Sequence, residues 1–199
     1  MLLALIAFGS NYEAKSNLVK GLKALNQQVR ILGISAVYEN PAIGKPTSPP
    51  YLNGVCLVET SLPAIDLHEQ ILRPIEDSLG RIRGEEGKAQ CSIDLDLILY
   101  EGEVLSTPNL ELPAPDILNY AYVAVPLGFL VPDWIHPVTK ETFAQIGNRF
   151  CQQKASFYHR VDVNAAIASE IFGSTRSAIK PIQSWHWRSV VLPPPKMSS

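Results

Sequence analysis

Two aspartates, Asp94 and Asp96, stand at alternate positions of the otherwise apolar run CSIDLDLILY, which extends from Cys91 to Tyr100. Aspartate is disfavoured in strands and is almost never fully buried unless it is paired. In a strand, residues two apart point to the same side, roughly 6.6 Å from one another. Carboxylates that close repel each other, and a divalent cation or a shared proton relieves the repulsion. Because Mg²⁺ is held by one or two carboxylates together with substrate phosphates, the pair predicts metal-dependent phosphoryl transfer.

A second interpretation makes the same aspartates ordinary solvated residues of an edge strand with one face in water. The D-x-D pattern is short and common, so its spacing alone does not decide between the two interpretations. Regular alternation would place Ile98 and Tyr100 on the same face as the aspartates. A face that combines carboxylates with large apolar side chains is not a simple polar exterior, and this favours the metal site.

Composition indicates a soluble, globular protein that acts on small molecules. Of its 199 residues, 46% are hydrophobic and 18% are charged, and the net charge is -2. This charge provides no attraction to nucleic acid or to an anionic membrane surface. The widely spaced Cys56, Cys91 and Cys151 suggest neither a disulfide framework nor a zinc site, so a cytoplasmic location is expected. The apolar start MLLALIAF predicts a buried first strand, and the oligomeric state stays open between monomer and homodimer.

The elements that must position the aspartates follow from hydrophobic periodicity. Apolar runs predict strands over 2–8, 29–38, 51–60 and around the aspartates. Helices are predicted between the first two strands, with Ser16 or Asn17 as the N-cap, and over 63–79. Pro74 predicts a kink or break near Ile71 unless the helix relaxes locally, since an interior proline costs about 3 kcal/mol. The order strand, helix, strand, strand, helix, strand predicts an α+β, ferredoxin-like antiparallel sheet with two helices on one face.

The motifs, taken in order along the chain, resemble a known family. GSN follows the first strand, YENPAIG precedes a proline-rich loop, and YLNGVCLVET, IEDSLGRIR, SIDLDLILY and VPLGFLVPDWIHP come later. This series is similar to the 6-hydroxymethyl-7,8-dihydropterin pyrophosphokinases of folate biosynthesis over about residues 1–150. The resemblance implies a ferredoxin-like core of α-β-α type and transfer of the terminal diphosphate of ATP to the hydroxymethyl group of the pterin. It also implies two Mg²⁺ ions bridged by the paired aspartates.

The resemblance assigns site residues position by position. Asp94 and Asp96 become the metal ligands and, together with Arg81, the catalytic residues. The pterin-binding residues that it implies are Asn40, Pro41, Ile43, Tyr51, Asn53 and Tyr122, the last where phenylalanine usually stacks on the pterin. Those implied for the nucleotide side are Glu76, Arg81, Arg83, Lys88 and Ile98, and residues 83–91 match a mobile lid. Taken singly, each has a purely structural alternative, but their common order along the chain favours the site.

Three phosphate-facing positions depart from the family's pattern. Cys91 and Tyr120 stand where arginines are usual, and Ala114 stands where a histidine is usual. A thiol does not replace a planar, bidentate guanidinium at a phosphate site. Three hypotheses therefore stay open: a divergent active pyrophosphokinase, a pterin-binding paralogue with weak or no kinase activity, and a related kinase with an altered pterin or donor. The residues that could partly compensate are Arg73, Arg83 and Lys88.

Residues 151–199 are predicted to form an extension that follows the family-like domain of residues 1–150. A helix is expected within FYHRVDVNAAIASEIFG, and the tail from about residue 193 is expected to be disordered. Trp185 and Trp187 could pack back on the domain or form a subunit contact, and packing back is the commoner outcome.

Overall fold

The computed structural model describes residues 1–42, 47–82, 90–153, 159–161 and 164–172. Within this part of the chain, one antiparallel sheet carries the strands in the order β5-β1-β4-β3-β8, with β2 also paired to β4. The strands of this sheet are β1 (Leu2–Ser10), β2 (Arg30–Ile34), β3 (Val37–Asn40), β4 (Tyr51–Thr60), β5 (Asp94–Tyr100) and β8 (His159–Val161). Since β2 and β3 follow one another along the same side of β4, the arrangement is the predicted ferredoxin-like one with an added strand.

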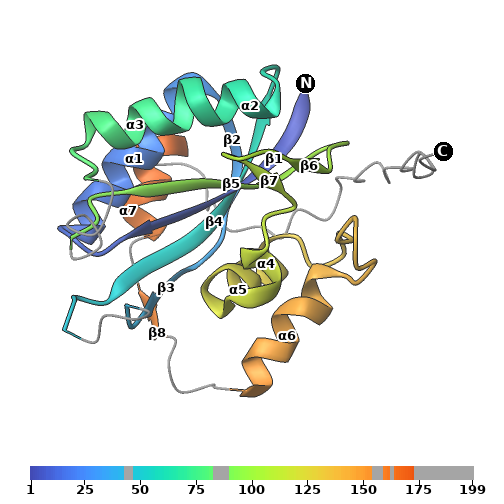
Figure 1. The fold of residues 1–199 in the computed structure, drawn as a ribbon. Helices are drawn as coiled ribbons and strands as arrows, with labels where there is room; N and C mark the ends of the chain where they lie inside the picture. Colours follow the sequence, from blue (N-terminus) through green and yellow to red (C-terminus); the bar gives the residue numbers. More distant parts are fainter. Residues whose placement is uncertain (43–46, 83–89, 154–158, 162–163, 173–199) are drawn as a thin grey trace.

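Helices cover both faces of the sheet, as Figure 1 shows. One face carries α1 (Ala14–Gln28), α2 (Ala64–Asp66), the π-helix η1 (Leu67–Leu72), α3 (Arg73–Ser78) and α7 (Asn164–Phe172). The opposite face carries α4 (Asp116–Asn119), α5 (Ala121–Leu130) and α6 (Phe143–Gln153). A short hairpin of β6 (Leu105–Ser106) and β7 (Glu111–Leu112) lies outside the sheet. The α+β class and the α-β-α layering that the sequence predicted are confirmed.

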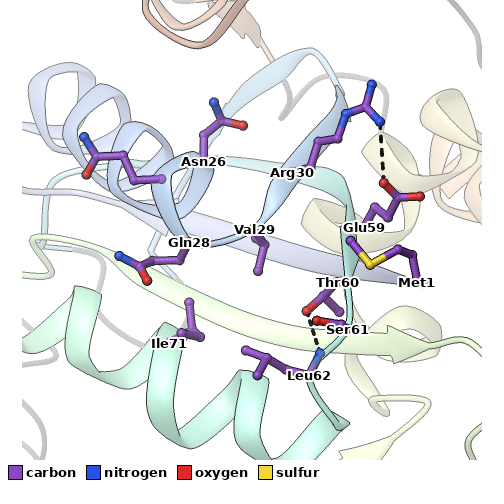
Figure 2. Close-up of a pocket in the computed structure, with 11 residues that line it drawn as sticks. Met1, Asn26, Gln28, Val29, Arg30, Glu59, Thr60, Ser61, Leu62 and Ile71 are labelled. Carbon is purple, nitrogen blue, oxygen red and sulfur yellow. Dashed lines mark hydrogen bonds and ion pairs between the residues drawn. The ribbon is translucent and has the colours of Figure 1, made fainter.

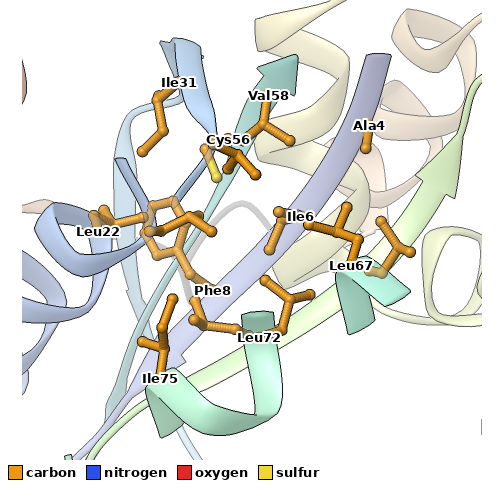
Figure 3. Packing of buried hydrophobic residues seen from close by; sticks show 14 of the residues in the cluster. Ala4, Ile6, Phe8, Leu22, Ile31, Cys56, Val58, Leu67, Leu72 and Ile75 are labelled. Atoms are coloured by element: carbon orange, nitrogen blue, oxygen red, sulfur yellow. The ribbon is translucent and has the colours of Figure 1, made fainter. Parts of the chain in front are cut away.

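Alternation along the strands divides the core into two clusters. Ile6, Phe8, Cys56 and Val58 point to the α1 face, where they meet Leu22, Leu67 and Leu72 (Figure 3). The intervening side chains point to the α5 face, and they include Leu5, Val55 and Leu57 together with Leu127 and Phe143. Because apolar side chains are buried on both faces, the sheet is packed firmly between two layers of helices.

A bulge in β5 corrects one expectation about the aspartate strand. Leu5 pairs with Leu99 and Ile6 with Leu97, so Ile98 is an extra residue on β5. Beyond the bulge the alternation is shifted, and Tyr100 packs on the α1 face, whereas Ile98 packs on the α5 face. The prediction that both share the aspartate face is therefore right for Ile98 and wrong for Tyr100, because a bulge adds one residue to one strand only.

The interior proline of the second helix is accommodated by a local change of helix type. Residues Leu67–Leu72 form a π-helix, and the backbone N–H of Arg73 donates to the carbonyl of His68, five residues earlier. Pro74 then falls in the first turn of α3, where its missing N–H is tolerated. The helix thus relaxes locally in the region where the sequence predicted a kink or break.

The predicted N-caps of the first helix are wrong. The helix begins at Ala14, and its N-cap is Glu13, which has a left-handed backbone conformation with φ of 43° and makes no side-chain capping bond. Asn17 lies inside the helix, and its side-chain amide donates to the carbonyl of Tyr12 at 2.7 Å. The side chain therefore ties down the turn that precedes the helix.

The described part of the C-terminal extension packs on the sheet and on α1. Strand β8 pairs with β3 through Val37 and Val161, and the side chains of Lys23 on α1 and Glu170 on α7 form an exposed ion pair at 2.7 Å. Ile167 of α7 is buried in the α1-face cluster. Helix α6 continues to Gln153, across the predicted boundary at residue 150. Trp185, Trp187 and the tail lie outside the described residues.

Candidate active site

The predicted pterin residues and the predicted metal residues meet through β1. Gly9 pairs with Asn53 of β4 on one side and with Asp94 of β5 on the other. Residues directly opposite one another in an antiparallel sheet share a face. Because Leu52 and Leu95 point into the α1-face cluster, Asn53, Asp94 and Asp96 must lie on the α5 face. The sheet register therefore brings together two groups of residues that are about forty positions apart in the sequence.

Gly9 keeps the space between these two groups open. A Cβ atom added at Gly9 would collide with the side-chain carbonyl oxygen of Asn53 and would lie 3.7 Å from the ring of Tyr51. Any larger residue at this position would displace the Asn53 amide. The glycine of the GSN motif is thus required for close approach of the strands' side chains, in addition to its place before a turn.

Asn53, Gly9 and Asp94 form a row across three neighbouring strands, and two buried amides lie at its β4 end. The Asn53 Nδ2 group donates to Asn40 Oδ1 at 2.5 Å, and Asn40 Nδ2 donates to the carbonyl of Pro41 at 3.2 Å. Both asparagines are nearly fully buried. Their side chains hold each other in fixed orientations, which presents amide edges suited to reading the hydrogen-bonding edge of a planar heterocycle.

Tyr51 connects the amide pair with the segment that leads to the aspartates. Its hydroxyl lies close enough to the Cys91 thiol for each group to affect the pKa of the other, and burial is the main cause that raises the pKa of Tyr51 to about 12. The Cys91 side chain is fully buried, and burial followed by the charge of Asp94 raises its pKa to about 12. Both groups are therefore neutral at pH 7. The thiol faces the protein interior in the position where the resemblance expected a phosphate-binding arginine.

The two aspartates differ in their surroundings. Asp94 is half-buried and accepts an ion-paired hydrogen bond at 3.1 Å from Arg81 Nη2. Asp96 is open to solvent on one side, yet protein crowds it on the others. This loss of hydration, followed by the negative charges of Asp94 and Glu76, raises the pKa of Asp96 to about 7. A cation bound between the aspartates would remove the repulsion that raises this pKa.

Glu76 supports the aspartate strand from the α1 face. Its side chain is fully buried, with Oε1 accepting from the Leu95 backbone N–H at 2.8 Å and Oε2 accepting from Arg73 Nη1 at 3.1 Å. Leu95 lies between the aspartates, so this bond fixes the backbone from which both carboxylates project. Arg73, considered above as a compensating phosphate ligand, forms an ion pair with Glu76. A direct role of Glu76 in nucleotide binding stays a prediction.

Helix α5 places aromatic rings over the same face. Tyr122 stacks on Tyr120, with ring centroids 5.2 Å apart and an angle of 20° between the planes. Burial, and next the charge of Asp116, raises the pKa of Tyr122, and the aspartates contribute further. The Tyr122 hydroxyl is therefore within electrostatic reach of the carboxylates. Tyr120, where the resemblance expected an arginine, is part of this stack.

Asp116, at the start of α4, is a carboxylate that no sequence pattern selected. Burial, followed by the charge of Asp94, raises its pKa, and its own charge contributes to the raised pKa of Asp96. It comes 20 residues after Asp96, at a spacing that no strand or helix period singles out. Only the folded chain shows that it is near the pair.

Of the other residues predicted for the site, one is in the core, one is at the surface, and three lie outside the described part of the chain. Ile98 is buried in the α5-face cluster, and its carbonyl accepts from the Ala114 N–H at 2.8 Å. Pro41 is exposed beside Asn40. Ile43, Arg83 and Lys88 lie outside the described residues.

The residues present fit a divalent metal that is shared with substrate. Among the described residues, no group of three or more His, Cys, Asp or Glu side chains is arranged to hold a metal ion by itself. Asp94 and Asp96 supply two carboxylates on one face, and hard cations such as Mg²⁺ complete their shells with phosphate oxygens and water. Such a site would bind metal well only when a phosphate substrate is present.

A separate cavity of about 570 Å³ lies at the opposite end of β1 and β4 (Figure 2). Its lining includes Asn26 and Gln28 from the end of α1, and the ion pair between Arg30 and Glu59 at 3.5 Å. A smaller cavity of about 350 Å³ lies beside the β6–β7 hairpin and is lined in part by Pro113 and His136. Neither cavity includes an aspartate of β5.

In the part of the chain that the structure describes, no helix has the length and apolar character needed to cross a membrane.

The fold and the site together define an α+β protein in which two carboxylates of β5 share one face of the sheet with the hydrogen-bonded amides of Asn53 and Asn40. The family model of 7,8-dihydro-6-hydroxymethylpterin-pyrophosphokinase (HPPK) matches residues 5–132, and the chain belongs to this family. The family resemblance inferred from the sequence motifs is thus confirmed. The activity of that family is diphosphate transfer from ATP to the hydroxymethyl pterin.

Individual relatives agree with this membership. The 2-amino-4-hydroxy-6-hydroxymethyldihydropteridine pyrophosphokinase of Haemophilus influenzae is 30% identical over 157 residues, which cover 77% of this chain and 96% of that protein. The folic acid synthesis protein fol1 of Schizosaccharomyces pombe is 31% identical over 180 residues, 87% of this chain but only 24% of that protein. The chain thus spans about a quarter of the length of this second relative.

Solved structures agree on the fold. The wild-type Plasmodium falciparum HPPK-DHPS with pteroate superposes with a TM-score of 0.62 at 11% identity, over 80% of this chain and 47% of that one. An HPPK-DHPS in complex with substrates gives a TM-score of 0.62 at 13% identity, over 80% and 48%.

Proposed function

We propose that this chain is a Mg²⁺-dependent pyrophosphokinase that transfers diphosphate from ATP to 6-hydroxymethyl-7,8-dihydropterin. The observation that carries the proposal is the row of Asn53, Gly9 and Asp94 across three adjacent strands. In this proposal the amides of Asn53 and Asn40 bind the flat, hydrogen-bonding ring, and the carboxylates on the same face bind the metal that carries the phosphates. In this proposal the spacing of the strands therefore sets the distance between the pterin, which accepts the diphosphate, and ATP, which donates it.

In this proposal each described residue has a separate task. The Asn53 and Asn40 amides recognise the edge of the pterin, and Tyr51 and Tyr122 enclose its faces. The pterin hydroxymethyl oxygen attacks the β-phosphorus of ATP, the bond from that phosphorus to the α-phosphate oxygen breaks, and AMP leaves. The hydroxyl proton passes to solvent or to a carboxylate of the site. The metal, when bound, neutralises phosphate charge; Arg81 holds Asp94 in the orientation needed for that metal.

A pterin-binding protein with little transfer activity is the second candidate. It is favoured first by Cys91, which is buried near Tyr51 instead of presenting a cation to phosphates. The Tyr120–Tyr122 stack points the same way, because it places an aromatic ring where a phosphate-binding arginine is usual. Two ions, the nucleotide-side roles of Arg83 and Lys88, a cytoplasmic location and the choice between monomer and homodimer belong to the proposal as expectations.

The deciding experiment measures AMP formation from ATP and 6-hydroxymethyl-7,8-dihydropterin in the presence of Mg²⁺. We expect AMP to depend on both the pterin and the metal, and to fall at least about 10³-fold in the double variant Asp94→Ala, Asp96→Ala, which removes both metal ligands. AMP formation no greater than in that variant, together with pterin binding measured by calorimetry, would leave the second candidate. Absence of pterin binding as well would refute both.

A further inference from the structure

Asn11, the last residue of the GSN motif, joins two segments that enter the site from different directions. It is 5% exposed although it lies in the turn after β1, which is unusual for a turn asparagine. Its backbone and side chain make hydrogen bonds to both segments. None of these bonds is predicted by the asparagine's ordinary role in a turn, where the side chain bonds to its own neighbouring backbone.

The first set of bonds holds the segment before the aspartates. The Cys91 N–H donates to Asn11 Oδ1 at 2.6 Å, and the Cys91 carbonyl accepts from the N–H groups of Asn11 and Tyr12 at 3.0 and 3.1 Å. The fully buried Ser10 adds its hydroxyl, which donates at 2.7 Å to the Ser92 carbonyl and is also 3.1 Å from that of Cys91. The backbone three residues before Asp94 is therefore fixed to the end of β1.

The second bond holds the segment before the pterin pocket. Asn11 Nδ2 donates to the carbonyl of Pro49 at 3.3 Å, two residues before Tyr51 begins β4. The Tyr51 hydroxyl in turn lies near the Cys91 thiol. One carboxamide therefore uses its oxygen on the metal side and its nitrogen on the pterin side, and Tyr51 closes the loop between them.

We propose that Asn11 is a positioning residue that couples the pterin pocket to the aspartate strand. The inference rests on the proposed function for its kinetic consequences, but the coupling itself is a property of the fold. Asn11 is not expected to touch either substrate. It acts by keeping the Tyr51 ring and the aspartate backbone at a fixed separation, on which in-line transfer between two bound substrates depends.

The test compares Asn11→Ala and Asn11→Asp with the wild-type chain. The alanine variant loses both sets of side-chain bonds, while the aspartate variant keeps an oxygen for the Cys91 N–H and loses the donor to Pro49. We expect Asn11→Ala to raise both the KM for the pterin and the Mg²⁺ concentration for half-maximal rate about five- to tenfold, the size of one lost hydrogen bond. Asn11→Asp should raise the pterin KM by a similar factor and leave the Mg²⁺ dependence within about twofold.

A matched control exists in the same chain. Asn26 is a half-buried asparagine whose Oδ1, like that of Asn11, accepts a backbone N–H, here from Ile31 at 3.1 Å, and it lines the distant cavity of Figure 2. Asn26→Ala should lower the melting temperature about as much as Asn11→Ala. It should change neither the KM for the pterin nor the Mg²⁺ concentration for half-maximal rate. If Asn11→Ala does not fold, the comparison is made between Asn11→Asp and Asn26→Asp.

Amide exchange measured by NMR separates this inference from the proposed function. The Cys91 N–H should exchange faster in Asn11→Ala and remain protected in Asn11→Asp, whether or not the wild-type chain is active. Loss of activity in the wild type would refute the proposed function and leave this measurement intact. Kinetic constants for Asn11→Ala that match those of Asn26→Ala, or identical effects of both Asn11 variants on pterin and Mg²⁺, would overturn the coupling.

Discussion

Removing the charge of Asp96 should stabilise the metal-free protein at neutral pH. The pKa of this carboxyl is raised from 3.8 to about 7 in the folded chain, so its ionised form is disfavoured there. A difference of about three pKa units corresponds to roughly 4 kcal/mol for a fully buried group. Because Asp96 is open to solvent on one side, screening reduces the value, and we expect about 1–2 kcal/mol.

The sign of the effect follows from the direction of the pKa shift. Below pH 4 the carboxyl is protonated in both the folded and the unfolded chain, so it does not lower the stability of the folded state. As the pH rises from about 4 to 7, the unfolded chain ionises first, and the folded state loses stability relative to it. The amide of Asn carries no charge at any of these pH values. Asp96→Asn should therefore gain nothing near pH 4 and its full benefit above pH 7.

Thermal unfolding in EDTA measures this difference. For a chain of this size, about 1–2 kcal/mol corresponds to a rise in Tm of roughly 3–6 °C at pH 8, falling to about zero near pH 4. Asp94→Asn is the control, because it removes the partner of Arg81 and should not stabilise at either pH. An equal gain at both pH values, or a loss at pH 8, would refute the electrostatic reasoning.

Three further predictions rest on close contacts. Gly9→Ala should lower the affinity for the pterin at least about tenfold, because the new methyl group meets the Asn53 amide. Calorimetry measures this affinity, and an unchanged value would contradict the role of Asn53 in binding the pterin. Glu76→Gln should lower the free energy of unfolding by about 1–2 kcal/mol in urea at pH 7, because it loses the Arg73 pair; no change would contradict its role in holding β5. Gly147→Ala should lower the free energy of unfolding by about 2 kcal/mol, since its Cβ would lie 2.9 Å from the Ala124 carbonyl where α5 crosses α6. Asn148→Ala, at an exposed position of the same helix, should lower it little. A smaller loss of stability for Gly147→Ala than for Asn148→Ala would contradict this packing argument.

The sequence predicted the sheet and the aspartate face well, because both depend on local periodicity. Alternation over Asp94 to Ile98 was sufficient to put the carboxylates on one side. It failed at Tyr100, since a bulge is a property of two paired strands and cannot be seen in one. The N-cap failed for a related reason: Glu13 adopts a left-handed conformation that no residue pattern in the helix indicates.

The parts of the site that the sequence did not predict depend on distant contacts. Asp116 is selected only by its proximity to Asp94, and Glu76, named from the sequence for the nucleotide side, is seen only in the fold to bond to the backbone of Leu95. Cys91 illustrates the same limit, because its type suggested a lost phosphate ligand and its burial against Tyr51 shows an interior contact. Residue type and spacing identify candidates, whereas the direction of a side chain is decided by the rest of the fold.

The position of β5 at one edge of the sheet has a consequence for how the protein behaves at high concentration. An exposed edge strand offers unpaired backbone groups to other chains and can start aggregation. On β5 the Leu95 N–H is already occupied by Glu76 and the Ile98 carbonyl by Ala114, while the bulge bends the strand between them. The edge can therefore stay accessible to substrates without serving as a template for a neighbouring molecule. At the opposite edge β8 covers β3, so removal of residues 154–199 should expose a strand that self-associates more readily.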